Sequence, residues 1–391
     1  MLCVLTGPGR ARSERPTGTE KILRGATRLH DVSGDPRVEQ YARLLVEDCV
    51  GVQSGWQVLV RSQPLAKPLI DAVSREIARR GAYALPRITL DSAGANSAWA
   101  KEAPEELLED LAPIDAHAIQ KADCFIAIIA PENTRDGSDI PPERMALLQA
   151  AGRKYAEPFF RDEKPWVGCQ WPTSALAQDA GMTLEQFTDF LYGAVLIDWP
   201  ALEREMEKIA ERFDEAKKVR IVGNDTDLTF SLDGRKGKVS GAGANMPSGE
   251  VFYSPVEDSA NGVVTFSEYP AYYFGRDVHG ARLRFEDGRA VEITAGSNED
   301  FFKSVLTSDD GASVLGEFGI GCNPGIQEHM RNTLFDEKIE GTIHLAMGNG
   351  FPFIGGKNES AVHWDMVKDL RRGGELYVDG ELVQKNGDWQ L

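Results

Sequence analysis

The first half of the chain alternates between helical spacing of apolar residues and short apolar or β-rich runs. The expected helices cover residues 36–49, 69–81 and 142–155, and the expected strands cover residues 56–60, 83–90, 124–130 and 166–169. The run CFIAIIA, residues 124–130, is the most apolar short run in the chain, which predicts a central strand. Strands that alternate with helices predict a parallel sheet in an α/β domain.

The pattern changes near Lys217. Residues 183–218 carry apolar stripes at helical spacing, whereas short strand-like runs separated by Gly, Asp and Asn follow from Val219 onward. Such runs are typical of antiparallel strands, and Asp379-Gly380 between two of them predicts a hairpin. We therefore expect an α/β domain over residues 34–217. A second domain, α+β and rich in antiparallel strands, is expected over residues 218–391.

The first 33 residues differ from both predicted domains. They are rich in arginine and poor in acidic residues, and their first apolar run is too short for a secretory signal. We expect a poorly ordered extension over residues 1–33, outside both folded domains.

Charge and composition narrow the classes of partner. The 391 residues hold 61 acids against 43 bases, a formal net charge of -18, which argues against nucleic acid and against an anionic membrane surface. No apolar run approaches the roughly 18 residues that a membrane helix needs. The five cysteines form no CxxC pair, which predicts reduced thiols and a cytoplasmic protein.

Candidate metal ligands gather near the end of the chain. His344, His363 and Asp365 lie in one short, glycine-rich stretch, residues 341–365. On a strand, residues two apart point to the same face, so His363 and Asp365 could hold one ion together. Imidazole nitrogens and carboxylate oxygens are ordinary ligands of first-row metals.

Three further acids in the second predicted domain complete a candidate metal site. Glu250 and Glu317 lie among small and apolar residues, and Glu337 lies in NTLFDEKI. A buried carboxylate is costly unless it is paired or bound to a cation. Four carboxylates and two imidazoles suit two divalent ions that share a bridging carboxylate. Such a pair can activate a water molecule to attack an amide.

Other catalytic classes lack their motifs. There is no GxSxG element and no cysteine with a local nucleophile signature, which argues against serine or cysteine catalysis. The α/β domain has no GxGxxG fingerprint, so no dinucleotide cofactor is expected there.

Three blocks of the second half resemble one known family. GEVFYSPVEDSANGVVTF, NTLFDEKIEGTIHLAMG and GGKNESAVHWDMVKDL are similar to the M29 metalloaminopeptidases of the aminopeptidase T group, and the similarity begins near Arg37. The resemblance implies release of N-terminal residues from peptides. It also implies a homodimer that encloses the active site, and a dinuclear centre of Zn, Co, Mn or Mg in an antiparallel C-terminal domain.

The resemblance also assigns residues. The family's ligand positions fall on Glu250, Glu317, Glu337, His344, His363 and Asp365. Glu317 falls where the family has a ligand that touches both metals and also has a catalytic role.

One position departs from the family pattern. Phe351 stands where the family has a tyrosine thought to stabilise the tetrahedral intermediate. Loss of one oxyanion donor can cost about 2.7–4 kcal/mol of transition-state stabilisation. Three interpretations follow: the metals suffice, Tyr253 supplies a phenol from elsewhere, or the chemistry has moved away from peptide hydrolysis.

Two other functions compete with the aminopeptidase. His344, His363 and Asp365 match the 2-His-1-carboxylate triad of non-haem iron oxygenases, and a ring-cleaving dihydroxypyridine dioxygenase is similar in fold to M29 proteins. That alternative requires one Fe(II), whereas hydrolysis favours two divalent ions. The third hypothesis is a metal-binding protein without catalysis.

Overall fold

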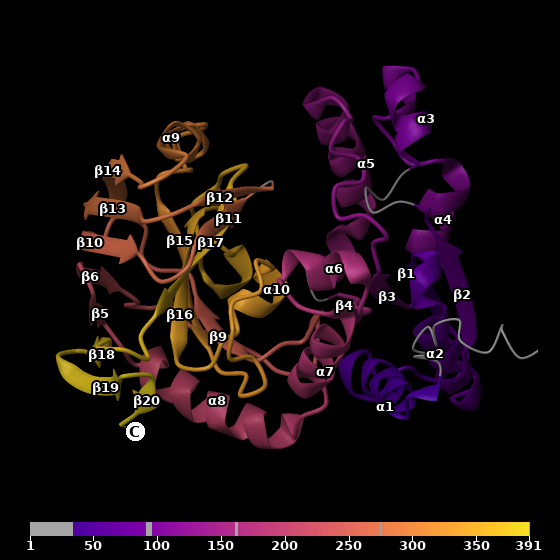
Figure 1. The fold of residues 1–391 in the computed structure, drawn as a ribbon, viewed down its shortest axis with the longest axis horizontal. Helices are drawn as coiled ribbons and strands as arrows, with labels where there is room; N and C mark the ends of the chain where they lie inside the picture. Colours follow the sequence, from indigo (N-terminus) through magenta and orange to yellow (C-terminus); the bar gives the residue numbers. More distant parts are fainter. Residues whose placement is uncertain (1–33, 91–95, 161–162, 274, 391) are drawn as a thin grey trace, which may run out of the picture. The chain divides into compact units, whose positions relative to one another are not determined.

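The computed structural model describes residues 34–90, 96–160, 163–273 and 275–390. The extension expected over residues 1–33 lies outside the described residues. The chain from Pro36 to Leu391 forms one compact unit, whose elements are shown in Figure 1. None of the helices in the described ranges is both long and apolar enough to cross a bilayer.

A five-stranded parallel sheet is built mainly from the first half of the chain. Its order is β2-β1-β3-β4-β8. Its strands are β1 (Gln57–Ser62), β2 (Tyr83–Ile88), β3 (Cys124–Ile129), β4 (Trp166–Gln170) and β8 (Asn245–Met246). β3 is the middle strand, and Cys124, Ile126 and Ile128 on it are buried. The predicted central parallel strand and the α/β class are confirmed.

Helices follow these strands in the predicted alternation. They are α1 (Arg37–Arg43), the π-helical η3 (Leu44–Cys49), α2 (Lys67–Arg79), α3 (Ser97–Glu102), α4 (Pro113–Lys121), α5 (Pro142–Phe160), α6 (Ser174–Asp179), α7 (Leu184–Val195) and α8 (Trp199–Asp214). Short 3-10 turns are η4 (Pro64–Ala66), η5 (Glu105–Leu107) and η6 (Pro352–Ile354). α7 begins with a capping box in which the Thr183 and Gln186 side chains each accept a backbone N–H. The capping box fixes where this helix starts.

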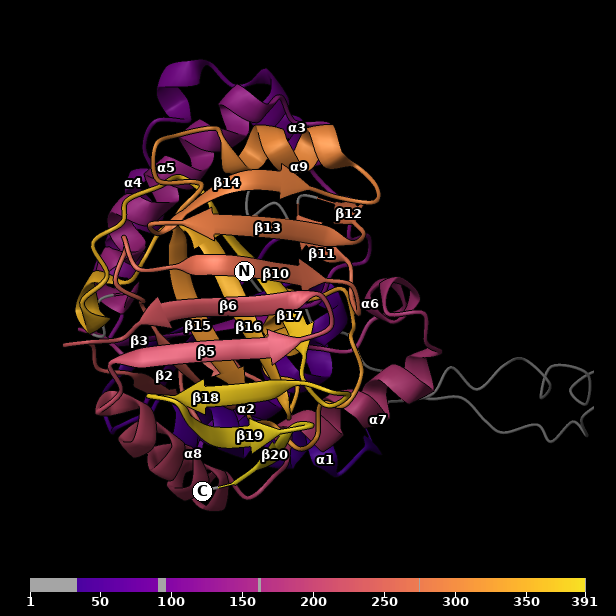
Figure 2. The same ribbon diagram turned by 90° about the vertical axis from the view of Figure 1, so that its left-hand side faces the viewer.

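An eight-stranded antiparallel sheet begins directly after α8. Figure 2 shows its strands side by side in the order β14-β13-β10-β6-β5-β18-β19-β20. They are β5 (Lys218–Gly223), β6 (Thr226–Ser231), β10 (Asn261–Phe266), β13 (Ala281–Glu286), β14 (Arg289–Thr294), β18 (Glu375–Val378), β19 (Glu381–Lys385) and β20 (Asp388–Trp389). The predicted hairpin is present, since β18 and β19 flank Asp379 and Gly380, which both have positive φ.

A five-stranded antiparallel sheet carries most of the candidate ligands. Its order is β17-β16-β15-β9-β7. The strands are β7 (Lys238–Ser240), β9 (Glu250–Tyr253), β15 (Leu315–Gly321), β16 (Thr342–Gly348) and β17 (His363–Asp369), and β15 and β16 are buried along their whole lengths. Phe318 of β15 packs against Phe230 of β6, with ring centroids 5.1 Å apart, so the two antiparallel sheets share an aromatic core. The antiparallel part of the predicted fold class is confirmed.

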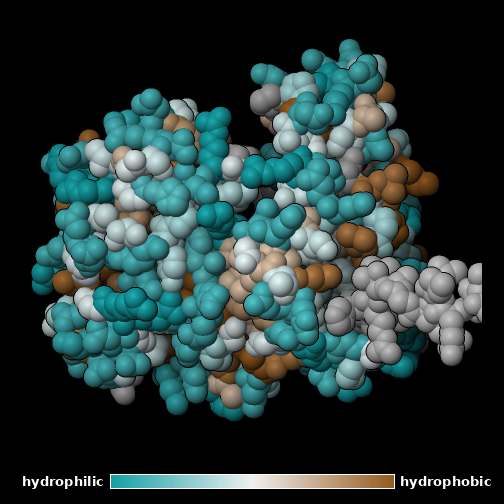
Figure 3. Space-filling view, viewed as in Figure 1, coloured by the Kyte–Doolittle hydropathy of each residue, from teal (hydrophilic) through white to brown (hydrophobic). Residues whose placement is uncertain are grey.

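The remaining elements are small, and the boundary expected near Lys217 stays a prediction. They are β11 (Ala271–Tyr273) and β12 (Arg276–Val278), which pair with each other, α9 (Glu299–Leu306) and α10 (Thr333–Asp336). β8 lies beyond Lys217 in the sequence but pairs with β4, so the later part of the chain adds a strand to the parallel sheet. In the view of Figure 3, the face over the antiparallel strands is mostly hydrophilic, in keeping with the many charged residues.

Candidate metal centre

Five of the six predicted ligands lie on one sheet. Glu250 begins β9, Glu317 lies on β15, His344 on β16, and His363 and Asp365 on β17. The strand register aligns Glu317 with Ala346 and Ala346 with Asp365. Because alternate residues of a strand share a face, these side chains meet above the same face of the sheet.

Small residues make room for this cluster. Gly319 of β15 lies opposite His344 of β16. A Cβ atom at Gly319 would lie 1.9 Å from Cε1 of the His344 ring, so a larger residue would displace the imidazole. The close approach of the ring to the backbone therefore requires glycine at this position.

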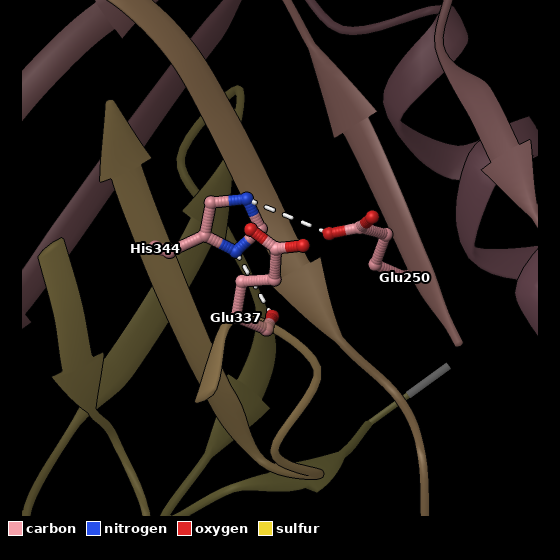
Figure 4. Close-up of side chains that lie close together, drawn as sticks. All are labelled: Glu250, Glu337 and His344. Atoms are coloured by element: carbon pink, nitrogen blue, oxygen red, sulfur yellow. Dashed lines mark hydrogen bonds and ion pairs between the residues drawn. The ribbon is translucent and has the colours of Figure 1, made fainter. Parts of the chain in front are cut away.

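The sixth predicted ligand comes from outside the sheet. Glu337 is the C-cap residue of the short helix α10 and reaches the cluster from above the strands. Figure 4 shows the side chains of Glu250, Glu337 and His344 turned toward one another. Their potential ligand atoms lie within 4.8 Å of one another, and those of Glu317, His363 and Asp365 do so as well. The six residues thus form two neighbouring groups of three.

Both imidazoles are oriented by backbone carbonyls. Nδ1 of His344 lies 3.0 Å from the carbonyl oxygen of Glu337, and Nδ1 of His363 lies 2.9 Å from that of Asn349. An Nδ1–H that donates to a carbonyl leaves Nε2 to face the carboxylates, which is the usual arrangement of a metal-binding histidine. The structure therefore aims both Nε2 atoms into the cluster.

Glu317 lies between the two groups. Its Oε1 is 3.4 Å from Nε2 of His344, and its Oε2 is 3.1 Å from Nε2 of His363. The residue is 4% exposed. One buried carboxylate thus reaches both imidazoles, which is the geometry that a bridging ligand needs.

The protonation of the cluster reflects its crowding. Burial raises the pKa of Glu250 to about 7 and that of Asp365 to about 6. Burial also opposes ionisation of Glu317, but its contacts with His344 and His363 outweigh burial and lower the pKa to about 2. Burial lowers the pKa of each imidazole, yet the neighbouring carboxylates outweigh it and raise both values to about 10. The cluster therefore favours added positive charge.

A divalent cation fits this donor set. Oε2 of Glu250 and Oδ1 of Asp365 are buried and have no hydrogen-bond partner among the described residues. Buried carboxylate oxygens without partners are costly, and coordination to a cation removes that cost. Carboxylate oxygens and imidazole nitrogens suit Zn, Co and Mn, and carboxylates also suit Mg.

One charged residue of the cluster was not foreseen from the sequence. Lys338 is completely buried, and its Nζ lies 3.3 Å from Oε1 of Glu250 and in contact with Oε1 of Glu337. A lysine placed directly after a candidate ligand and before the apolar Ile339 is a weak signal, since most lysines are exposed.

Tyr253 cannot supply the phenol that Phe351 lacks, so that interpretation was wrong. The hydroxyl of Tyr253 lies 3.1 Å from both the carbonyl oxygen of Ala210 and Oδ1 of Asp214, and the residue is fully buried. It points away from the ligand face because Phe318, its partner in the register, also faces the aromatic core. Phe351 does lie at the site, with its ring centroid 5.1 Å from that of His363.

A pocket opens beside two of the candidate ligands. It is lined by Pro270, Tyr272, His329, Thr333, Asp336, Glu337, Asp365 and Val367. His329 stacks on Tyr269 with ring centroids 4.7 Å apart, and its Nε2 lies 3.3 Å from Oδ2 of Asp336. The pocket therefore combines apolar lining residues with three acids, two of which, Glu337 and Asp365, are candidate ligands.

The family model described as thermophilic metalloprotease (M29) matches residues 34–389. The chain therefore belongs to the M29 family, and the enzyme class expected from the resemblance, a metalloaminopeptidase, is confirmed.

Curated relatives carry consistent names. The chain is 28% identical over 420 residues to aminopeptidase AmpS of Bacillus subtilis (strain 168), covering 90% of this chain and 98% of the relative. It is 26% identical over 412 residues to aminopeptidase 2 of Geobacillus stearothermophilus, with 91% and 98% covered. Aminopeptidase T of Thermus thermophilus is 27% identical over 410 residues, with 90% and 98% covered.

Solved structures share the fold. Wild-type AmpT from Thermus thermophilus superposes with a TM-score of 0.77 at 23% identity, covering 91% of this chain and 99% of that one. The 2,5-dihydroxypyridine dioxygenase of Pseudomonas putida gives 0.56 at 15% identity, covering 90% and 96%. At these identities the likeness shows the fold alone, so the two solved structures do not by themselves choose between the two chemistries.

Proposed function

We propose that the chain hydrolyses N-terminal residues from peptides at the six-residue centre, with Glu317 as the catalytic carboxylate. The observation that carries this proposal is the position of Glu317, which is buried and within 3.4 Å of both imidazoles. Membership of the M29 family supports the reaction class.

The metal complement that we propose is two divalent ions, Zn, Co, Mn or Mg. Glu250, Glu337 and His344 would hold one ion, and His363 and Asp365 would hold the other, with Glu317 shared. When bound, such ions would polarise the scissile carbonyl and lower the pKa of a bound water molecule.

The protein's own groups would position and move protons. The carbonyl oxygens of Glu337 and Asn349 fix the imidazole rings, so that both Nε2 atoms keep one direction during turnover. A carboxylate oxygen of Glu317 would take a proton from the attacking water and return it to the leaving amine, as a general base and then a general acid. Because Glu317 is buried, bulk water does not compete for its oxygens.

The pocket beside Asp365 would receive the free N-terminus. An ammonium group is attracted to carboxylates, and the pocket lining includes Asp336, an acid that is not among the six candidate ligands. A peptide whose amine is acetylated loses that charge and gains bulk. We therefore expect the centre to cut unblocked peptides and to leave acetylated ones intact.

A direct assay tests the reaction. Metal-free protein is loaded with Zn, Co, Mn or Mg and mixed with Leu- and Ala-arylamides and with a short peptide in free and N-acetylated forms. We expect metal-dependent release of the first residue from the unblocked substrates. Metal binding without turnover of any aminoacyl substrate would overturn the proposal.

We also propose that the chain is a cytoplasmic homodimer that encloses the active site, as the family resemblance implies. Cys49, Cys124, Cys169 and Cys322 are free thiols, which suits a reducing compartment. Light scattering on the purified protein should give twice the 42.9 kDa chain mass. A monomer that keeps full activity would contradict this part of the proposal.

The ring-cleaving dioxygenase is not favoured. The carboxylates of Glu250, Glu317 and Glu337 converge on the two histidines, whereas a 2-His-1-carboxylate centre needs only Asp365. The match to the M29 family points the same way. Oxygen uptake with one bound Fe(II) would reverse this choice.

A further inference from the structure

The two groups of candidate ligands differ by one charged side chain. Lys338 has no exposed surface, and its Nζ touches Glu337 and lies 3.3 Å from Glu250. A lysine side chain carries an ammonium group, and here two carboxylate side chains contact that ammonium directly. The ammonium group is therefore a permanent positive charge within one half of the centre.

The geometry points to unequal metal sites. We propose that Lys338 acts as a built-in cation for the half formed by Glu250, Glu337 and His344. The half formed by Glu317, His363 and Asp365 then binds one divalent cation tightly, and the first half binds a second cation much more weakly. This inference rests on the proposed function, because it takes the six residues as ligands.

Lys338 lowers the negative charge of the first half. Glu250 and Glu337 carry -2 together, and Lys338 reduces this to -1. A cation that enters the first half also meets the ammonium at close range, and like charges repel strongly in a buried site. Both effects weaken cation binding in the same half.

Atom positions give a second reason. Nζ of Lys338 forms ion pairs with Oε1 of Glu250 and Oε1 of Glu337, two of the oxygens that could ligate a cation. A cation bound to those same atoms must displace the ammonium, and the side chain is enclosed on all sides. Oε2 of Glu250 has no hydrogen-bond partner among the described residues and lies 3.6 Å from Nε2 of His344, so these two atoms remain available to a weakly held second ion.

The chain offers a matched control for this lysine. Lys368 of β17 is also fully buried, and its Nζ lies 2.8 Å from Oε1 of Glu268 and 2.8 Å from the carbonyl oxygen of Thr265. None of its bonded partners is a candidate ligand. Lys368→Met therefore removes an equally buried ammonium away from the cluster.

The test is a cation titration of metal-free protein followed by calorimetry, with Mn²⁺ as a spectroscopic probe. For the wild type we expect one tight Mn²⁺ and a second bound at least about a hundredfold more weakly. At one equivalent, the electron paramagnetic resonance signal should be that of an isolated Mn²⁺. Two sites of equal affinity, or a spin-coupled pair at one equivalent, would overturn the inference without any variant.

Variants assign the effect to Lys338. In Lys338→Met the second cation should bind at least about tenfold more tightly than in the wild type, and the metal-free protein should melt at a lower temperature that added Mn²⁺ restores. Lys368→Met should keep the wild-type affinities. Unchanged or weaker second binding in Lys338→Met would contradict the inference.

Failure of the inference and failure of the proposed function give different results. Two equal sites with metal-dependent aminopeptidase activity would reject the role of Lys338 alone. Full wild-type Mn²⁺ binding in Asp365→Asn would show that the six residues are not the ligands, and would reject both.

Discussion

The two halves of the candidate centre differ in access to solvent. The side chain of His363 is 31% exposed, whereas that of His344 is 1% exposed. Each half adjoins the pocket through one residue, Asp365 in the half around His363 and Glu337 in the half around His344, but in the latter half the ammonium of Lys338 contacts Glu337. We infer that a substrate enters on the His363 side and that the His344 side serves mainly to anchor Glu317. The predictions below separate these two roles.

The largest effect on activity is expected at Glu317, which lies between the two halves of the centre. Glu317→Gln keeps the size of the side chain but removes a proton acceptor, and loss of a general base typically costs about 10²–10⁴-fold in rate. We expect kcat to fall by at least about 10³-fold, because a ligand is weakened at the same time. Glu375→Gln, on the other antiparallel sheet, serves as the control. A loss below tenfold would remove Glu317 from its proposed role.

We expect Asp365, in the half around His363, to control the metal content more strongly than a neighbouring acid outside the cluster. Asp365→Asn and Asp369→Asn change the same strand, but Asp369 bonds to Arg371 and Tyr269 instead of facing the cluster. We expect Asp365→Asn to lower the affinity for the tight cation by about a hundredfold or more, because losing a residue that merely hydrogen-bonds to a metal ligand already costs about 10–100-fold. Asp369→Asn should lower the melting temperature and leave metal content intact. Equal metal loss in both variants would contradict the assignment.

The pH dependence of metal stabilisation follows from four raised pKa values. Folding raises the pKa of Glu250, Asp365, His344 and His363, so the metal-free folded chain binds more protons than the unfolded chain. The contribution of these four groups to the stability of the metal-free protein is fully present when the pH lies below their pKa values in the unfolded chain. It is lost as the pH rises through about 6 and 7 for the acids and through about 10 for the imidazoles.

Cation binding displaces these protons, so its effect has the opposite sign. The increase in melting temperature on adding Zn should be larger at pH 9 than at pH 6, because fewer protons compete at high pH. At each pH the melting temperature of metal-free protein is subtracted from that of the Zn-loaded protein. The contributions of titrating groups outside the centre therefore cancel. A Zn-induced shift that is constant or smaller at pH 9 would show that these four groups do not bind the cation.

The smallest effect is expected at Phe351. Phe351→Tyr adds a hydroxyl near His363 without changing a ligand. If the phenol can reach the oxyanion, kcat should rise by about tenfold or less, below the usual worth of a preorganised donor. KM and metal content should stay unchanged. A fall in metal content would mean that the aromatic ring is needed to support His363.

Much of the fold could be predicted because strands and helices carry local periodic signals. The run of residues 124–130 predicted the middle parallel strand, and Asp379-Gly380 predicted a hairpin; both are present. β8 was beyond prediction, since two residues, Asn245 and Met246, pair with a strand more than seventy positions earlier. Such pairing depends on tertiary packing and leaves no period in the sequence.

The centre was predictable only in part. His363 and Asp365 have the spacing of one strand face, so their nearness could be expected from local geometry. The role of Lys338 could not, because its burial depends on Glu250, which lies 88 positions away in the sequence. The hypothesis that Tyr253 supplies a phenol was wrong for the same kind of reason, since its partner Asp214 comes from another element, α8.

The most direct test of the central claim is metal-dependent release of an N-terminal residue by wild-type protein and by Glu317→Gln, with the metal content of both measured by elemental analysis. The account predicts that metal-free wild type is inactive, that added divalent cation restores cleavage of an unblocked peptide, and that Glu317→Gln stays inactive. Equal cleavage by the two proteins, or cation-loaded wild type that releases no residue from any peptide, would contradict it.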